Sequence, residues 1–140
     1  MSKWYGNVIN RLEENGPSAP IEVGTDITEY LWSDRECYYV TEVISQKCVK
    51  VRRYHVMADL DKEGGLGHQN WVYFKTAKER NEYLEAHGKE VYSDYEYPDQ
   101  TWVFRYNSWW SAHRSADGTS YSKNPKVRFG VRDYHYDWEF

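Results

Sequence analysis

The fold is decided by residues 38–56, which read YYVTEVISQKCVKVRRYHV. Two runs in this stretch, residues 38–44 and 48–56, are rich in Val, Tyr and Thr, the residue types that favour strands. Only Ser45, Gln46 and Lys47 separate the runs, which is the length of a tight connection between antiparallel strands. The stretch therefore predicts a β-hairpin, to which the rest of the chain adds strands.

Further strand patterns follow along the chain, each bounded by polar or turn-forming residues. They predict strands at residues 71–75, 91–97, 101–106 and 127–132. Residues 117–125 are polar and are predicted to form a loop.

Two short helices interrupt the β pattern. Residues 1–16 carry apolar side chains at helical spacing from residue 3 to residue 15, so we expect an amphipathic N-terminal helix that docks on its own sheet or pairs with a second copy. Thr76 and Glu79 form a capping-box pattern that opens an inserted helix over residues 76–88. The predicted fold class is α+β: a single antiparallel, sheet-rich domain over residues 1–140, with a short N-terminal helix and one inserted helix.

Composition narrows the class of function. The chain has 140 residues and a net charge of −4, which argues against a binder of long nucleic acids, because such proteins need an excess of Lys and Arg. Long apolar runs and an apolar N-terminal signal core are absent from the sequence, so we expect a cytoplasmic protein that does not enter a membrane. The 7 Trp and 14 Tyr residues predict an aromatic core.

Catalytic and metal-binding patterns are missing from the sequence. The two cysteines, Cys37 and Cys48, are too few for a disulfide framework and are not spaced as zinc ligands. The five histidines are scattered, and a two-histidine phosphodiesterase would need two H-x-S/T motifs, of which only residues 113–115 supply one. We expect no cofactor, no metal and no catalytic residue.

The C-terminal stretch VRFGVR, residues 127–132, carries the clearest binding signal. Apolar residues and arginines alternate in it, so on one strand Arg128 and Arg132 would share a face, about 13 Å apart, with Gly130 leaving room for a ligand. Guanidinium groups match phosphate oxygens with forked donors. Surface arginines paired with carboxylates are the alternative interpretation.

Other candidate ligand-binding residues lie in turns and aromatic strands. Asp34 is predicted to hold a turn that fixes Arg35, and Asn107 sits in a predicted hairpin turn with groups suited to a base edge or a ribose hydroxyl. Tyr97 and Trp102 offer flat faces on which adenine stacks.

Several of these motifs together resemble a known family. They are residues 32–35 (WSDR), the hairpin that follows, residues 106–109 (YNSW), and the ending GVRDYHYDWEF at residues 130–140. The chain resembles the phage Thoeris anti-defence signal-sponge proteins, the first Thoeris anti-defence family, over residues 21–140 apart from the inserted helix.

The resemblance implies a non-catalytic function. It implies that the chain binds and sequesters a cyclic ADP-ribose-type immune signal without cleaving it, and so inhibits a bacterial anti-phage defence. Carried over to matching positions, it implies that Arg35, Asn107, Arg128 and Arg132 hold phosphates and ribose hydroxyls. An aromatic residue near Tyr97 or Trp102 would stack on adenine.

The resemblance also implies a homodimer or higher homo-oligomer with a second site, for cyclic oligonucleotides, between subunits. Arg11 would belong to that site, but residues 123–126, KNPK, stand where a second arginine is expected. Two other functions remain open. A protein-binding phage inhibitor, such as an anti-CRISPR protein, would present an acidic surface that mimics nucleic acid, and a degradative phosphodiesterase would form product with time.

Overall fold

The computed structural model describes residues 19–62 and 70–135. In these ranges the chain is a strand-rich antiparallel sheet domain with one short helix, compatible with the α+β class and mostly β. The predicted N-terminal helix and Arg11 lie outside the described residues. No helix in the described ranges is long and apolar enough to cross a membrane.

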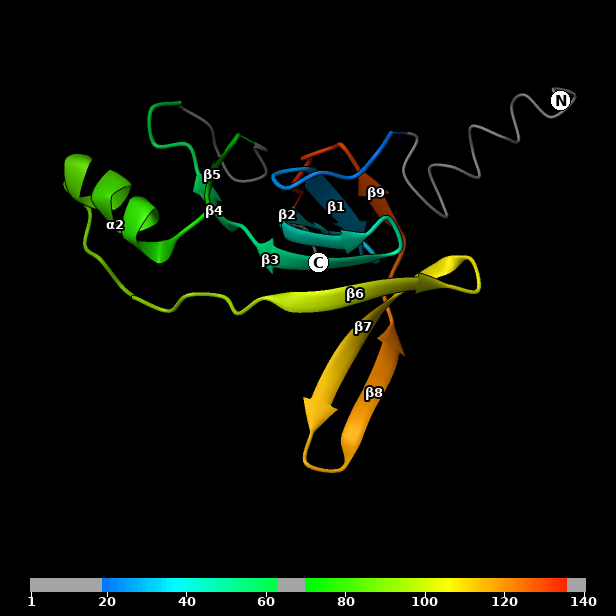
Figure 1. Cartoon of the computed structure of the whole chain (residues 1–140). Helices are drawn as coiled ribbons and strands as arrows, with labels where there is room; N and C mark the ends of the chain where they lie inside the picture. Colours follow the sequence, from blue (N-terminus) through cyan, green and yellow to red (C-terminus); the bar gives the residue numbers. More distant parts are fainter. Residues whose placement is uncertain (1–18, 63–69, 136–140) are drawn as a thin grey trace, which may run out of the picture.

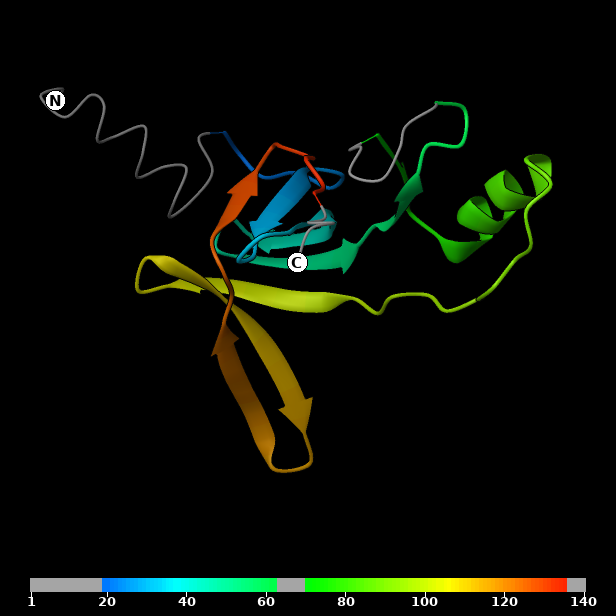
Figure 2. The same cartoon turned by 180° about the vertical axis from the view of Figure 1, so that it is seen from behind.

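Seven strands form the main sheet, in the order β8-β7-β6-β3-β2-β1-β9, and every neighbouring pair is antiparallel. Two further strands form a small sheet, and the helix α2 follows it. The bounds are β1 Asp26–Tyr30, β2 Arg35–Ser45, β3 Cys48–Arg53, β4 His55–Ala58, β5 Trp71–Phe74, α2 Ala77–Ala86, β6 Gln100–Arg105, β7 Ser108–Ser115, β8 Gly118–Lys123 and β9 Val127–Phe129. Figure 1 shows the β7–β8 hairpin projecting away from the rest of the sheet, and Figure 2 shows the same arrangement from behind.

The predicted hairpin is confirmed by the β2–β3 pair, in which Val40 lies opposite Val51 and Ser45 opposite Cys48. Its second strand is shorter than predicted. The chain leaves the main sheet at Tyr54, whose amide donates to the Cys37 carbonyl at 3.0 Å, and continues as β4 in the small sheet with β5.

The capping box is also confirmed. The Thr76 hydroxyl accepts from the Glu79 amide at 3.1 Å, and the Glu79 carboxylate accepts from the Thr76 amide at 3.3 Å. These bonds satisfy amides that a helix start leaves without partners.

Three strand predictions need correction. Residues 91–97 were expected to form a strand but pair with no strand among residues 19–62 and 70–135, and the Ser93 carbonyl instead accepts from Arg80 and Asn81 of α2. Residues 117–125 were expected to form a loop, yet Gly118–Lys123 is strand β8, because β7 offers it an antiparallel partner. The C-terminal strand ends at Phe129, since Gly130 adopts a φ of 87° that turns the chain.

The core lies on both faces of the sheet. On one face, the sheet curls around a cluster in which Trp102, Val51 and Ile27 are completely buried. The curl brings β9 near β7, where the Trp109 and Phe129 ring centroids are 5.0 Å apart. On the other face, a smaller cluster forms where the main sheet meets β4 and β5; its members are Cys37, Tyr39, Tyr54, Val56, Tyr73 and Tyr134.

Candidate functional site

Two of the predicted arginines lie on the face of the main sheet that bears the smaller cluster. The strand register places Arg128 opposite Thr28, Thr28 opposite Cys37, and Tyr30 opposite Arg35. Side chains alternate along a strand, so these residues share one face of β9, β1 and β2. We call it the arginine face.

Arg132 reaches this face by a different route from the one predicted. Equal parity on a single strand was the predicted cause, and it is wrong, because β9 ends before Gly130. After the turn, the chain crosses the sheet and is held by Thr28, whose hydroxyl donates to the Val131 carbonyl at 2.7 Å and accepts from the Asp133 amide at 3.1 Å. The loop thus places Arg132 above the same face as Arg128.

The side chain of Arg132 is held by aromatic rings. Its guanidinium carbon lies 4.2 Å from the centre of the Tyr73 ring and 5.4 Å from that of Tyr54. Arg132 itself is exposed, and none of the ion pairs among the described residues includes it. A guanidinium that lies over an aromatic ring can still donate N–H bonds to an anion.

Both tyrosines that support Arg132 are themselves fixed. The Tyr73 hydroxyl accepts from the Tyr134 amide at 3.0 Å. The Tyr54 hydroxyl donates to the Asp26 carboxylate, and burial together with this bond raises the pKa of Tyr54 well above its usual range. Sequence reasoning missed both tyrosines, since they lie far from Arg132 along the chain.

Arg35 is paired with a carboxylate. Its Nη1 atom lies 2.5 Å from Oδ2 of Asp133, and its guanidinium lies 5.6 Å from the centre of the Tyr30 ring. Asp34 lies in the β1–β2 turn, where its carbonyl accepts from the Leu31 amide at 2.9 Å. Arg35 was predicted as a ligand-binding residue, and its guanidinium is already engaged by the Asp133 carboxylate.

The remaining predicted residues lie elsewhere. Trp102 is 0% exposed and packs edge-on against Tyr38, so its ring is not accessible to an adenine. Asn107 lies in the β6–β7 turn with a φ of 60°. Tyr97 stacks on His55 with centroids 4.6 Å apart and has Arg53 at 5.1 Å from its ring centre. The structure therefore places Arg35, Arg128 and Arg132 on one face of the sheet and encloses one of the two predicted base-stacking residues, Trp102.

A cysteine thiol, the group of Cys37, lies beneath the arginine face. Cys37 is completely buried beside Thr28, with its Sγ atom 3.9 Å from the Thr28 hydroxyl oxygen. Burial raises the pKa of this thiol to about 11, so the sulfur stays protonated at neutral pH. The surroundings of this thiol therefore do not activate it as a nucleophile.

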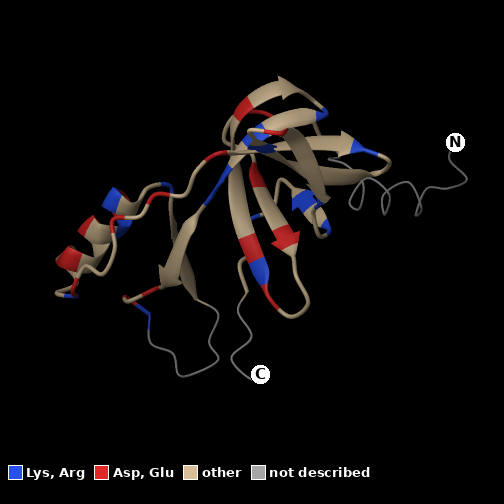
Figure 3. Cartoon of the chain, turned by 90° about the horizontal axis from the view of Figure 1, so that it is seen from below, with Lys and Arg blue, Asp and Glu red and all other residues tan. Residues whose placement is uncertain are grey.

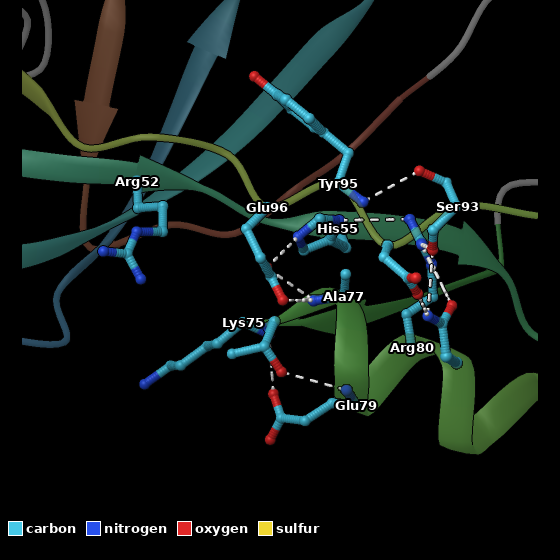
Figure 4. A network of polar contacts seen from close by, with 12 residues as sticks. Arg52, His55, Lys75, Ala77, Glu79, Arg80, Ser93, Tyr95 and Glu96 are labelled. Atoms are coloured by element: carbon cyan, nitrogen blue, oxygen red, sulfur yellow. Dashed lines mark hydrogen bonds and ion pairs between the residues drawn. The ribbon is translucent and has the colours of Figure 1, made fainter.

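A second polar cluster, which sequence reasoning missed, joins β4, α2 and residues 93–97 (Figure 4). His55 is 3% exposed, and its Nε2 atom lies 3.2 Å from Oε1 of Glu96, while its Nδ1 atom lies 3.4 Å from Nη1 of Arg80. Because arginine only donates, Nδ1 accepts and Nε2 carries the proton. Burial is the main cause that lowers the pKa of His55.

Glu96 and Arg80 extend this cluster to the backbone. The Glu96 carboxylate accepts from the Ala77 amide at 2.8 and 2.9 Å, at the positive end of α2, and these bonds lower its pKa. Arg80 donates to the Ser93 carbonyl at 2.5 Å. The cluster fixes α2 against the segment that precedes β6, so its role is structural.

In the part of the chain that the structure describes, no group of three or more His, Cys, Asp or Glu side chains is placed to hold a metal ion. Comparison of the chain with protein-family models, with curated proteins and with solved structures found no match.

Proposed function

We propose that this protein binds a cyclic ADP-ribose-type signalling nucleotide at the arginine face and sequesters it without cleavage, and that it thereby inhibits the Thoeris defence of a bacterial host. The observation that carries the proposal is the exposed Arg132 guanidinium stacked on Tyr73 at 4.2 Å. Arg128 adds a second positive charge on the same face by its register opposite Thr28. Charge-assisted hydrogen bonds from such groups are the strong contacts by which proteins hold phosphates.

Sequestration rather than turnover is supported by the chemistry beneath the face. The Cys37 thiol has a pKa of about 11, and the hydroxyl of Thr28 is occupied by the backbone of residues 131–133. Neither group is poised as a nucleophile. The two phosphates of a bound nucleotide would bind to two arginines, and the nucleotide would dissociate without being cleaved.

The experiment is binding followed by release. The full-length protein is mixed with cyclic ADP-ribose, separated from free ligand, heated to denature it, and the released material is analysed by mass spectrometry. Intact ligand released from the wild type, and little from Arg132→Gln, supports the proposal. Arg114→Gln, which changes an exposed arginine on the β7–β8 hairpin, is the matched control and should retain the ligand. Release of a cleaved product would contradict sequestration.

A nucleic-acid mimic has less support. Acidic residues are mixed with basic ones along α2 and the strands (Figure 3). Several carboxylates are also neutralised internally, among them Glu36 by Arg53 at 2.6 Å and Asp99 by Arg52 at 2.7 Å. A mimic needs a continuous acidic surface, because it must attract a basic cleft over the length of a nucleic acid.

A further inference from the structure

The β7–β8 hairpin is the part of the sheet with the least cover. It projects away from the other strands (Figure 1), and every residue of β8 is exposed. The end of β7, from His113 to Ser115, is exposed as well. Few of these side chains reach the core, so packing does not account for their chemistry.

Positive charge collects in this part of the chain. Residues 100–126, which hold β6, β7 and β8, include four Lys or Arg residues and one acidic residue, Asp117. The segment therefore carries a net charge of +3, whereas the whole chain carries −4. The charge of the whole chain argues against binding along a long nucleic acid, but a local contact with a polyanion depends on the charge of the contacting surface.

Three of these cations share one face of the hairpin with two aromatic rings. Side chains alternate along a strand, and the pairing of β7 with β6 and β8 fixes which residues lie together. The face opposite to the core carries Arg105, Arg114, Lys123, Trp110 and Tyr121, and we call it the hairpin face.

Both rings are held in place without being enclosed. The Arg105 guanidinium carbon lies 5.2 Å from the centre of the Tyr121 ring, and Tyr121 is 44% exposed. The Trp110 indole Nε1 donates to the Arg105 carbonyl at 3.0 Å, and Trp110 is half-buried. Aromatic rings fixed at a surface offer faces on which bases stack.

The cations of the hairpin face are not neutralised by carboxylates. None of the ion pairs among residues 19–62 and 70–135 includes Arg105, Arg114 or Lys123. Elsewhere in the sheet, ion pairs hold Arg35, Lys50, Arg52 and Arg53. Unpaired cations beside exposed rings are the combination with which proteins bind single-stranded nucleic acid.

We propose that the hairpin face binds a single-stranded segment of nucleic acid, about four nucleotides long. Bases stack on Trp110 and Tyr121, and the three cations bind the phosphates between them. An anionic membrane surface suits the hairpin less well, because β8 has no aliphatic side chain to insert. In the strand order, β7 and β8 lie at the opposite end of the sheet from β1 and β9, so this contact is independent of the nucleotide proposed for the arginine face.

The test is fluorescence anisotropy of labelled oligo-dT and oligo-U, each about 12 nucleotides long, titrated with the full chain at several salt concentrations. We expect saturable binding to one or both, and the tighter one identifies the nucleic acid as DNA or RNA. Replacing Arg105, Arg114 and Lys123 together by Gln should weaken binding at least tenfold. It should also lower the slope of log affinity against log salt by about two, because each phosphate contact on a single strand contributes about 0.7.

Two controls separate this surface from general attraction to cations. Replacing Lys47, Lys78 and Lys89 together by Gln removes the same charge from exposed sites elsewhere and should change binding little. Arg132→Ala, on the arginine face, should leave it unchanged. Tyr121→Ala should weaken binding about tenfold and Tyr121→Phe should retain it, because phenylalanine keeps the stacking ring.

The proposal is overturned if neither oligonucleotide gives saturable binding, or if the two triple variants weaken it equally. It is also overturned if Tyr121→Phe loses as much affinity as Tyr121→Ala, or if Arg132→Ala abolishes binding. Equal affinity for a duplex of the same length, whose bases are not free to stack, or tighter binding to vesicles of anionic lipid, would assign the hairpin a different partner.

Discussion

The guanidinium of Arg132 stacks on the ring of Tyr73 at 4.2 Å, and the Tyr73 hydroxyl is held in turn by the amide of Tyr134, two residues beyond the arginine. The loop that carries Arg132 therefore also fixes the tyrosine ring on which the guanidinium lies. An arginine held in this way loses little side-chain freedom when it binds an anion, which favours affinity.

Replacing this arginine should weaken ligand binding. Arg132→Ala is expected to lower the affinity for cyclic ADP-ribose by more than tenfold, because loss of a charged hydrogen-bonding partner costs roughly 1.5–3 kcal/mol. Arg132→Lys should recover only part of it, since an ammonium keeps the charge and loses the planar fork. Calorimetry at low and high salt measures both effects, and binding should be stronger at low salt. Equal affinities in folded wild type and variants would place the site elsewhere.

Gly130 is predicted to matter through its backbone. Its φ of 87° is one that side-chain-bearing residues rarely adopt, whereas the space where a Cβ atom would stand is open. Gly130→Ala should therefore lower the free energy of unfolding by about 1 kcal/mol from backbone strain alone. Gly130→Asn should lose less, because asparagine tolerates this conformation better. Urea unfolding of the two variants gives the comparison, and equal stability of Gly130→Ala and wild type would contradict it.

Local signals in the sequence were enough to predict the β2–β3 hairpin and the capped helix α2. Both depend on residues a few positions apart, such as Thr76 and Glu79. The β8 strand was missed because its sequence, GTSYSK, is polar and exposed throughout, and only pairing with β7 makes it a strand. Residues 91–97 have strand-like composition, yet they pair with no strand in the part of the chain that the structure describes.

The sequence was enough to propose arginines for the candidate site, but not to predict which elements position them. Alternation predicted Arg128 and Arg132 on one strand, but Gly130 ends that strand, and Arg132 reaches the face from the loop that follows. The tyrosines that hold Arg132 come from β5 and from the break between β3 and β4, so only the tertiary fold brings them to it. Trp102 was predicted as a stacking face, but packing of the curled sheet encloses it.

Glu96 is predicted to stabilise α2 from outside the helix. Glu96→Gln removes the negative charge at the helix N-terminus while keeping one acceptor oxygen, and should lower the free energy of unfolding by about 0.5–1 kcal/mol, with the partial exposure of this carboxylate limiting the effect. The matched control is Glu85→Gln, because Glu85 is exposed in the last turn of α2, where a negative charge is unfavourable. Urea unfolding should show loss for the first variant and none for the second.

The two histidines that contact α2 should give the unfolding free energy opposite dependences on pH. Burial lowers the pKa of His55 in the folded protein, so below about pH 6.5 the unfolded chain binds more protons at this residue, and its contribution to stability falls as the pH drops. Bonds to the Tyr83 carbonyl and to Asp61 raise the pKa of His87, which is partly exposed. The contribution of His87 is therefore present below about pH 6.5 and is lost as the pH rises through its folded pKa.

Urea unfolding of the wild type and the two histidine variants between about pH 5 and pH 8 tests the prediction, because the differences in unfolding free energy isolate each histidine. His55→Gln should reduce the loss of stability on acidification relative to wild type, whatever its effect at neutral pH, whereas His87→Gln should increase it. Glu29 and Glu36, whose pKa values burial raises, titrate alike in all three proteins and cancel from these differences. If the wild type and His55→Gln lose stability with the same slope below about pH 6.5, the fold does not disfavour protonation of His55 at Nδ1, and the account of the His55 cluster is wrong.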